Sequence, residues 1–204
     1  MSVFDERAAQ WELTGRRVKL AGDVVSAVIK YANPEKGMDI ADFGTGTGLI
    51  LLGLAEYAGT LTGYDSSEGM LDVLRQKAEK TGTPIKTVFM DIDNNFFPPE
   101  SADIVTASMV VHHLAHPQVF ICKAHEALRK GGRLCVADVV HSGVPFHDTP
   151  DPTVMHEGFG TAEIQRSFLE CGFRDVEVHE ASTMEKERDG KKVEFKIFLA
   201  VGVK

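Results

Sequence analysis

The chain has 204 residues, of which 43% are hydrophobic, and a formal net charge of −8 from 30 acidic and 22 basic side chains. This length and composition suit one globular domain with a filled core. The acidic balance disfavours a nucleic-acid groove, because phosphate binding requires clustered Lys and Arg. The charged N-terminus lacks the apolar core of a signal peptide, and no apolar run in the sequence approaches the length of a membrane span.

The three cysteines are widely spaced and form no C-x-x-C pair: Cys122, Cys135 and Cys171. Their number is odd, and all three lie in segments with an apolar period. We therefore expect buried free thiols in a reducing compartment, and a cytoplasmic protein.

Residues 5–32, which precede Asn33-Pro34, show helical periodicity with an interruption at Thr14-Gly15. The longer predicted helix covers residues 16–32 and ends before the proline. Its predicted apolar side consists of Val18, Leu20, Val24, Val25, Val28 and Ile29.

From residue 38 onward, predicted strands and helices alternate. The strands are 38–43, 60–65, 85–90, 102–108 and 133–140. The helices are 48–58, 67–80 and 117–129, the last ended by Lys130-Gly131-Gly132. This alternation predicts βαβ units and a parallel sheet.

The pattern changes after the fifth predicted strand. Residues 141–160 are rich in His, Gly, Pro and Asp and are predicted to form a long loop. A helix at 161–171 follows, and then two strands, 173–181 and 193–201, joined as a hairpin by the charged turn KERDGKK. The fold class is therefore α/β, a Rossmann-like three-layer sandwich. Its seven-stranded, mostly parallel sheet has one antiparallel strand in the C-terminal hairpin.

The domain prediction is a single domain over residues 1–204. Residues 35–204 form its core, and residues 1–34 form a helical appendage. Phe4, Trp11 and Arg17 of this appendage are candidates for a lid over a site at the sheet edge, although Trp11 can equally serve to anchor its helix.

The segment DIADFGTGTG, residues 39–48, runs from a strand into a helix start. Its alternate glycines let the backbone turn without Cβ clashes and let a ligand lie against the main chain, where helix N–H groups point. A dinucleotide fingerprint has the spacing G-x-G-x-x-G, but here the third glycine is Gly48, one position early. The form G-x-G-x-G after Asp42 resembles motif I of the class I S-adenosylmethionine (SAM)-dependent methyltransferases. A nicotinamide or flavin site is the main rival interpretation.

Two further acids follow predicted strands. Asp65 lies 21 residues after Gly44 and can accept hydrogen bonds from both ribose hydroxyls, as the acid of nucleotide folds does. Asp91 can accept from an adenine amino group, while the backbone N–H of Ile92 donates to a ring nitrogen. The alternative interpretations are a helix cap for Asp65 and an Asx-turn for Asp91.

The order of motifs extends the resemblance to most of the chain. DFGTGTG, GYD with SSEGML, MDID, SADIVTASMVVHHL and EALRKGGRL occur as in class I methyltransferases, and GFRDVEVHE and EFKIFLAVG match the C-terminal hairpin of that family. The chain resembles most closely the small-molecule type 11 or UbiE-like subgroup. The resemblance implies SAM as cofactor and S-adenosylhomocysteine as product. The cofactor-binding residues it implies are Asp42, Gly44, Thr45, Gly46, Gly48, Asp65, Ser66, Met70, Asp91, Ile92, Ser108, Met109 and His113.

Methyl transfer from SAM is a one-step displacement that depends on alignment of donor and acceptor. A general base is needed only when the acceptor must lose a proton. The candidates are His113 after the fourth strand and His147 and His156 in the long loop, each of which has a structural alternative. His116 completes the run HHLAH, but Pro117 follows it and no thiol or carboxylate is near in sequence, so we expect no metal.

The predicted function is therefore SAM-dependent methyl transfer to a small molecule. The acceptor pocket is expected between the N-terminal helices, the end of the fourth strand and residues 141–160. The alternatives are a non-catalytic SAM-binding regulatory protein and, less favoured, an NAD(P)-dependent oxidoreductase. We expect a small-molecule substrate and no nucleic-acid partner, and the sequence leaves a homodimer open.

Overall fold

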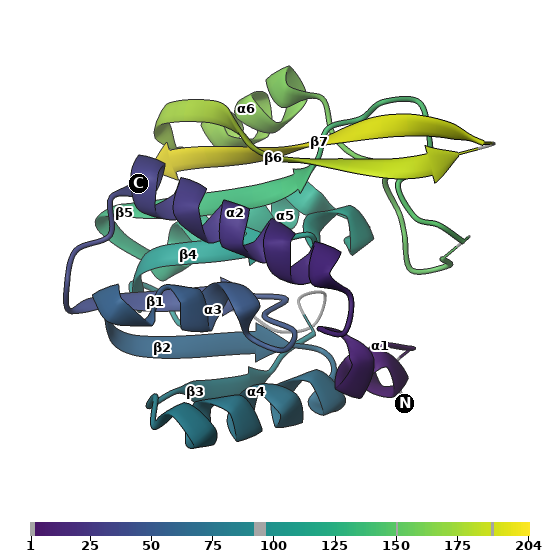
Figure 1. Ribbon diagram of the computed structural model, residues 1–204. Helices are drawn as coiled ribbons and strands as arrows, with labels where there is room; N and C mark the ends of the chain where they lie inside the picture. Colours follow the sequence, from purple (N-terminus) through teal and green to yellow (C-terminus); the bar gives the residue numbers. More distant parts are fainter. Residues whose placement is uncertain (1–2, 92–96, 150, 189) are drawn as a thin grey trace.

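The computed structural model describes residues 3–91, 97–149, 151–188 and 190–204. In these ranges, seven strands form one sheet in the order β3-β2-β1-β4-β5-β7-β6 (Figure 1). The strands β1 to β5 pair in parallel, and β7 is antiparallel to both β5 and β6. The predicted fold class is confirmed. The strands are β1 Met38–Phe43, β2 Ala58–Asp65, β3 Lys86–Phe89, β4 Ala102–Ser108, β5 Leu128–Val139, β6 Arg174–Arg188 and β7 Lys191–Val203.

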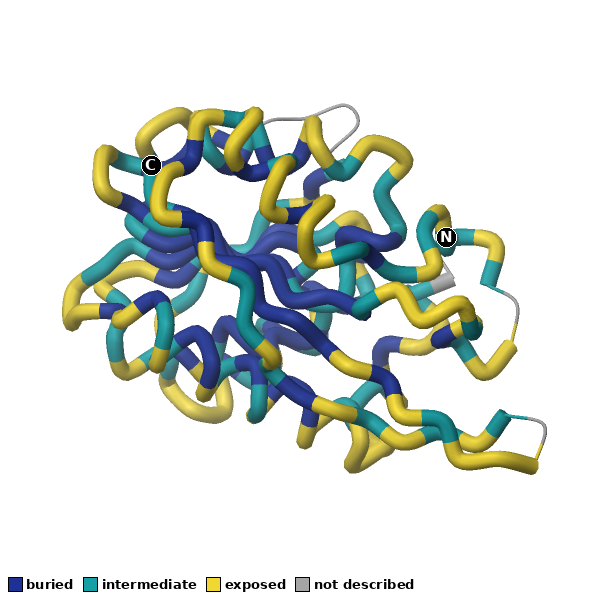
Figure 2. The backbone as a smooth tube through the Cα atoms, turned by 90° about the horizontal axis from the view of Figure 1, so that it is seen from above, coloured by how far each residue is buried: buried dark blue, intermediate teal, exposed yellow. Residues whose placement is uncertain are grey.

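Helices cover both faces of the sheet (Figure 1). They are α1 Val3–Arg7, α2 Gly15–Ala32, α3 Leu49–Gly53, α4 Glu68–Thr81, α5 Pro117–Ala127 and α6 Thr161–Glu170, with 3-10 turns η1 Ala8–Gln10, η2 Ala55–Tyr57 and η3 Val111–His113. One core, which includes Val24 of α2 and Leu51 of α3, lies on one face. The other core, which includes Phe120 of α5 and Phe168 of α6, lies on the opposite face. Figure 2 shows the buried residues gathered along the middle of the sheet.

Local sequence explains the helix ends that position the site. The Ser67 hydroxyl accepts a hydrogen bond from the Met70 N–H at 3.2 Å and so caps α4, as its residue type predicts. Gly82 ends the same helix in the left-handed conformation. In α2 the buried stripe runs through Leu20, Val24 and Val28. The expectation for Val18 is wrong: it is 44% exposed, because it lies at the edge of this stripe on the helix surface.

The largest differences from the predicted element boundaries lie in α3, β5 and the C-terminal hairpin. The helix after the glycine loop ends at Gly53, where a Cβ would approach the Val25 side chain of α2. Strand β5 begins at Leu128, so the predicted stop signal 130–132 lies inside it. The hairpin strands extend to Arg188 and from Lys191, because Lys186 and Arg188 donate hydrogen bonds to the Phe146 carbonyl and tie the hairpin to the preceding loop.

The expectation of three free thiols is wrong for two of them. Cys122 of α5 and Cys171, just after α6, form a disulfide with a Cα–Cα distance of 4.8 Å. They are 49 residues apart in sequence and meet because α5 and α6 pack on the same face. Cys135 is free and buried, as predicted. The cysteines therefore give no argument for a reducing compartment.

None of the helices in the described ranges has the length and hydropathy that crossing a bilayer requires.

Candidate cofactor and acceptor site

A cavity of about 460 Å³ lies at the carboxyl ends of β1, β2 and β4. Ligands of open α/β sheets bind at this edge. Residues of α1, α2 and the segment after β5 also line this cavity. The predicted site residues that line the cavity are Asp42, Gly44, Thr45, Gly46, Asp65, Ser66, Met70, Ser108, Met109, His113 and His147.

The glycine loop depends on backbone conformations that other residues rarely adopt. Gly44, Gly46 and Gly48 have φ values of +63°, +53° and +81°. A Cβ on Gly44 would collide with the Val110 side chain, so the chain passes close to the end of β4. Gly48 has a different role from the one predicted: it faces Leu74 of α4 and lets the loop pack against that helix.

Asp65, the last residue of β2, organises this loop. Its carboxylate accepts a hydrogen bond from the Gly46 N–H at 2.7 Å and another from the Ser67 N–H at 2.8 Å. Burial raises the pKa of Asp65, and these backbone donors oppose that effect. Each carboxylate oxygen has a second lone pair, so both can still accept from a ligand in the cavity.

Asp42, at the end of β1, is a buried acid in the cavity wall. The Thr106 hydroxyl donates to its carboxylate at 2.6 Å. Loss of solvent raises the pKa of Asp42 to about 7, and Thr106 opposes the shift. A cation placed beside this carboxylate would favour its ionised form.

Asp91 follows β3, next to the end of β2. The Met90 N–H donates to the Asp65 carbonyl at 2.9 Å, which holds the ends of the two strands side by side. The prediction for Ile92 falls outside the described residues.

The three candidate base residues lie in different surroundings. The Nδ1–H of His113 donates to the Thr153 carbonyl at 3.0 Å, and burial lowers the pKa of His113 to about 4. His147 lines the cavity, and burial lowers its pKa as well. His156 is not among the described lining residues; its Nε2–H donates to the Leu114 carbonyl at 3.0 Å and holds η3 in place.

His112 also lines the cavity and was not predicted as a site residue. It is buried, and its Nδ1–H donates to Asp138 of β5 at 2.7 Å. The other oxygen of Asp138 accepts from the His112 backbone N–H at 3.1 Å. The neighbouring histidines in SMVVHH were the only signal in sequence, because the partner Asp138 is 26 residues away.

The N-terminal segment lines the cavity and contacts the glycine loop, where the Thr47 hydroxyl donates to Glu12 at 2.6 Å. The ring of Phe4 contacts that of His113 edge-on, with centroids 5.5 Å apart, and the Arg17 guanidinium lies 3.9 Å from the centre of the Trp11 ring. Arg7 forms an ion pair with Asp151 at 3.0 Å. The Arg7–Asp151 pair therefore joins the N-terminal helix to the segment after β5, and the Phe4–His113 contact joins it to η3.

Residues 41–136 match the profile of a family described as "Methyltransferase domain". This match covers just under half of the chain. The chain is 33% identical over 159 residues to an uncharacterized methyltransferase of Schizosaccharomyces pombe, covering 71% of this chain and 56% of that protein. It is 35% identical over 104 residues to the ubiquinone biosynthesis O-methyltransferase of Dinoroseobacter shibae, covering 51% of this chain and 42% of that one. The chain spans about half the length of these curated relatives.

Solved structures share the fold of this methyltransferase domain at low sequence identity. The putative methyltransferase in complex with the Haloferax volcanii Trm112 activator aligns with a TM-score of 0.79 and 19% identity, covering 100% of this chain and 98% of that one. Haemonchus contortus phosphoethanolamine N-methyltransferase 2, crystallised with SAM, aligns with a TM-score of 0.71 and 15% identity, covering 100% of this chain and 60% of that one. The fold is that of the class I SAM-dependent methyltransferases, and SAM is the cofactor of the family. The comparisons support neither the oxidoreductase nor the non-catalytic alternative.

The residues present fit this cofactor. At Gly44 and Gly46 the backbone itself forms the cavity wall, and the buried acid Asp42 and the partly buried acid Asp65 line the same space. Acids in a poorly solvated wall suit a ligand that carries a sulfonium and an ammonium group.

Proposed function

We propose that the protein transfers a methyl group from SAM to a small-molecule acceptor. The observation that carries this proposal is the continuity of the cavity, which is lined by the glycine loop at one end and by His112, His113 and His147 at the other. Its volume of about 460 Å³ is within the range of small-ligand pockets.

The chain's own residues suit a division of this cavity into two halves. Asp65 and Asp91 are the acceptors for the ribose hydroxyls and the adenine amino group, and Asp42 faces the cationic methionine part. Ser108 and Met109, at the end of β4, lie where donor and acceptor would meet. SAM supplies an electrophilic methyl group when bound. The protein's task is then alignment, which contributes roughly 7–11 kcal/mol to lowering the barrier in well-oriented reactions.

The low pKa of His113 has a specific consequence for this arrangement. With a pKa of about 4, the ring is neutral at pH 7. Such a ring is a weak base, so it serves better as a wall of the site than as a proton acceptor.

The test is binding followed by turnover. Isothermal titration should show that each chain binds one molecule of SAM or one molecule of S-adenosylhomocysteine. NADH should give no heat of binding. Incubation with methyl-labelled SAM and a metabolite extract should then place the label in the small-molecule fraction. Label found only in protein or RNA would refute the small-molecule acceptor, and NADH binding without SAM binding would refute the whole proposal.

Asp42 should make SAM binding depend on pH. The free protein holds a proton on this carboxyl below about pH 7, and a bound cation favours its release. The dissociation constant for SAM should therefore be constant above about pH 8 and rise by up to about tenfold per pH unit below pH 7. Titration calorimetry between pH 5.5 and 8.5 measures this slope, and Asp42→Asn should flatten it. An equal slope in both proteins would assign the dependence to another group.

A further inference from the structure

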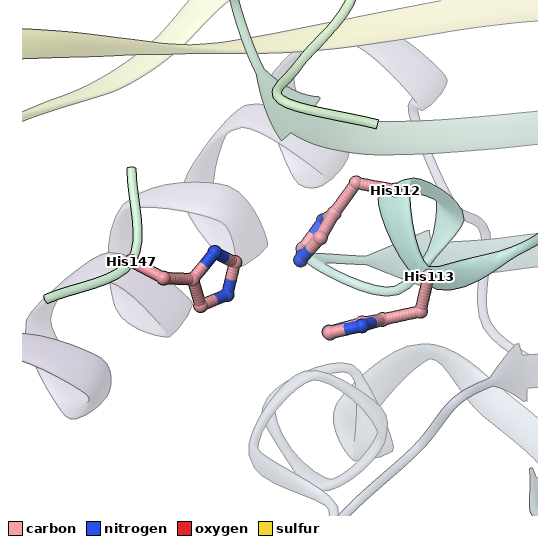
Figure 3. A group of neighbouring side chains, drawn as sticks. All are labelled: His112, His113 and His147. Atoms are coloured by element: carbon pink, nitrogen blue, oxygen red, sulfur yellow. The ribbon is translucent and has the colours of Figure 1, made fainter. Parts of the chain in front are cut away.

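Three imidazole rings meet at the acceptor end of the cavity. His112 and His113 come from η3, and His147 faces them from the loop after β5 (Figure 3). One potential ligand atom from each side chain lies within 4.8 Å of the other two. The ring centroids of His112 and His147 are 5.2 Å apart, although the residues are 35 positions apart in the chain.

His112 is held in the tautomer that a metal ligand requires. Its Nδ1–H donates to Asp138, so its Nε2 carries the lone pair. The side chain is 2% exposed, and Nε2 has no hydrogen-bond partner among the residues that the structure describes. An unpaired buried polar atom is costly and calls for an explanation such as a bound ion. A carboxylate behind the ring is the usual arrangement for ligating histidines.

The rings of His113 and His147 also carry nitrogen atoms that can coordinate an ion. The Nδ1–H of His113 donates to the Thr153 carbonyl, which leaves the Nε2 lone pair free to coordinate. His147 has a buried Nδ1 that also has no hydrogen-bond partner within the described part of the chain. One ring nitrogen from each of the three histidines therefore lies within 4.8 Å of the other two, and His112 and His147 each hold a buried nitrogen without a partner in the described residues.

We propose that His112, His113 and His147 bind one divalent transition-metal ion, with Zn²⁺ as the reference case. Three histidines with an open fourth position are the ligand set of a catalytic rather than a structural zinc site. Tetrahedral coordination needs nitrogen atoms about 3.4 Å apart, so the three rings, whose ligand atoms lie within 4.8 Å of one another, must draw together when an ion binds. His116, which the sequence pattern offered as a third ligand, is instead exposed at the start of α5.

The role of this ion rests on the proposed function. The open position faces the acceptor half of the cavity, where it would hold a hydroxyl or thiol group and lower its pKa. The acceptor then gives its proton to water, its lone pair forms the bond to the methyl carbon, and the electrons of the broken carbon–sulfur bond stay on the sulfur of the donor. This assigns an acceptor with an O–H or S–H group and removes the need for a histidine base.

Zinc binding can be measured without any methyl acceptor. Metal-stripped protein is titrated with Zn²⁺ by calorimetry and with Co²⁺ by visible absorbance, in the wild type and in His147→Gln. The matched control is His141→Gln, which changes an exposed histidine of the same loop. We expect one ion per wild-type chain and the same in His141→Gln. Zinc affinity in His147→Gln should fall by at least the roughly 10- to 100-fold that loss of a ligand's supporting partner produces. The His113→Gln variant should lose affinity in the same way, which guards against a folding defect in one variant.

Two results would overturn the metal site: absence of a tight ion in the wild type, or equal zinc affinity in His147→Gln and His141→Gln. A SAM titration of the same wild-type sample separates this inference from the proposed function. Normal SAM binding without zinc binding refutes only the metal, and zinc binding without SAM binding refutes only the methyltransferase proposal.

Discussion

Gly44→Ala should abolish measurable SAM binding and lower the free energy of unfolding by about 2–5 kcal/mol. Two effects add at this position. The left-handed backbone at φ +63° costs an L-residue about 1–2 kcal/mol. The new methyl group would also collide with Val110, and overpacking of this kind costs about 1–3 kcal/mol. Relief of the collision moves the loop into the cavity that it lines.

Gly82→Ala is the matched control for this experiment. Gly82 has nearly the same φ, +66°, but a Cβ there meets no atom of the described residues within 4 Å. The Gly82→Ala variant should lose only the conformational contribution to the free energy of unfolding, about 1–2 kcal/mol, and its affinity for SAM should not change. Urea denaturation and titration calorimetry on both variants measure the two effects. Equal losses in both variants would show that the approach to Val110 has no consequence.

Asp65→Ala should weaken SAM binding by about 5- to 150-fold, which corresponds to the roughly 1–3 kcal/mol of a lost charged hydrogen bond. The substitution removes the acceptor for a ligand and leaves the N–H groups of Gly46 and Ser67 without their partner. The glycine loop should therefore also become less ordered, which hydrogen exchange at Gly46 can detect.

The control for Asp65 is Asp72→Ala, which removes an exposed acid from the following helix. Its ion pair with Arg75 is exposed, so at most about 1 kcal/mol of stability and none of the SAM affinity should be lost. An unchanged dissociation constant in Asp65→Ala would reduce the role of this carboxylate to that of a local cap.

The strands and the glycine loop were predictable because the sequence patterns that indicate them are local. β1 and β4 have the predicted bounds, since continuous apolar runs between turn residues are typical of buried parallel strands. The position of Gly44 between a strand and a helix, and the acid at the end of β2, follow from the same alternation of elements. Boundaries that depend on distant partners were less accurate, as in the hairpin that Lys186 ties to Phe146.

The histidine cluster and the disulfide were not predictable in this way. His112 is one of two adjacent histidines, and only its contact with Asp138 distinguishes it from His113. His147 lies in a segment without periodicity, so nothing in the sequence indicates which strand end it approaches. Cys122 and Cys171 carry no pairing signal, because their spacing fits no recognised motif.

The sequence by itself therefore determined the sheet, the order of its elements and the cofactor half of the site, because short-range patterns of glycines, acids and apolar residues specify these. Only the tertiary structure decided which side chains meet at the acceptor half. The folding of the segment after β5 over η3 brings His147 to His112 and His113, and the packing of α5 beside α6 brings two cysteines together. Such contacts depend on long-range packing, in which residues far apart in the chain become neighbours without any local pattern that marks them.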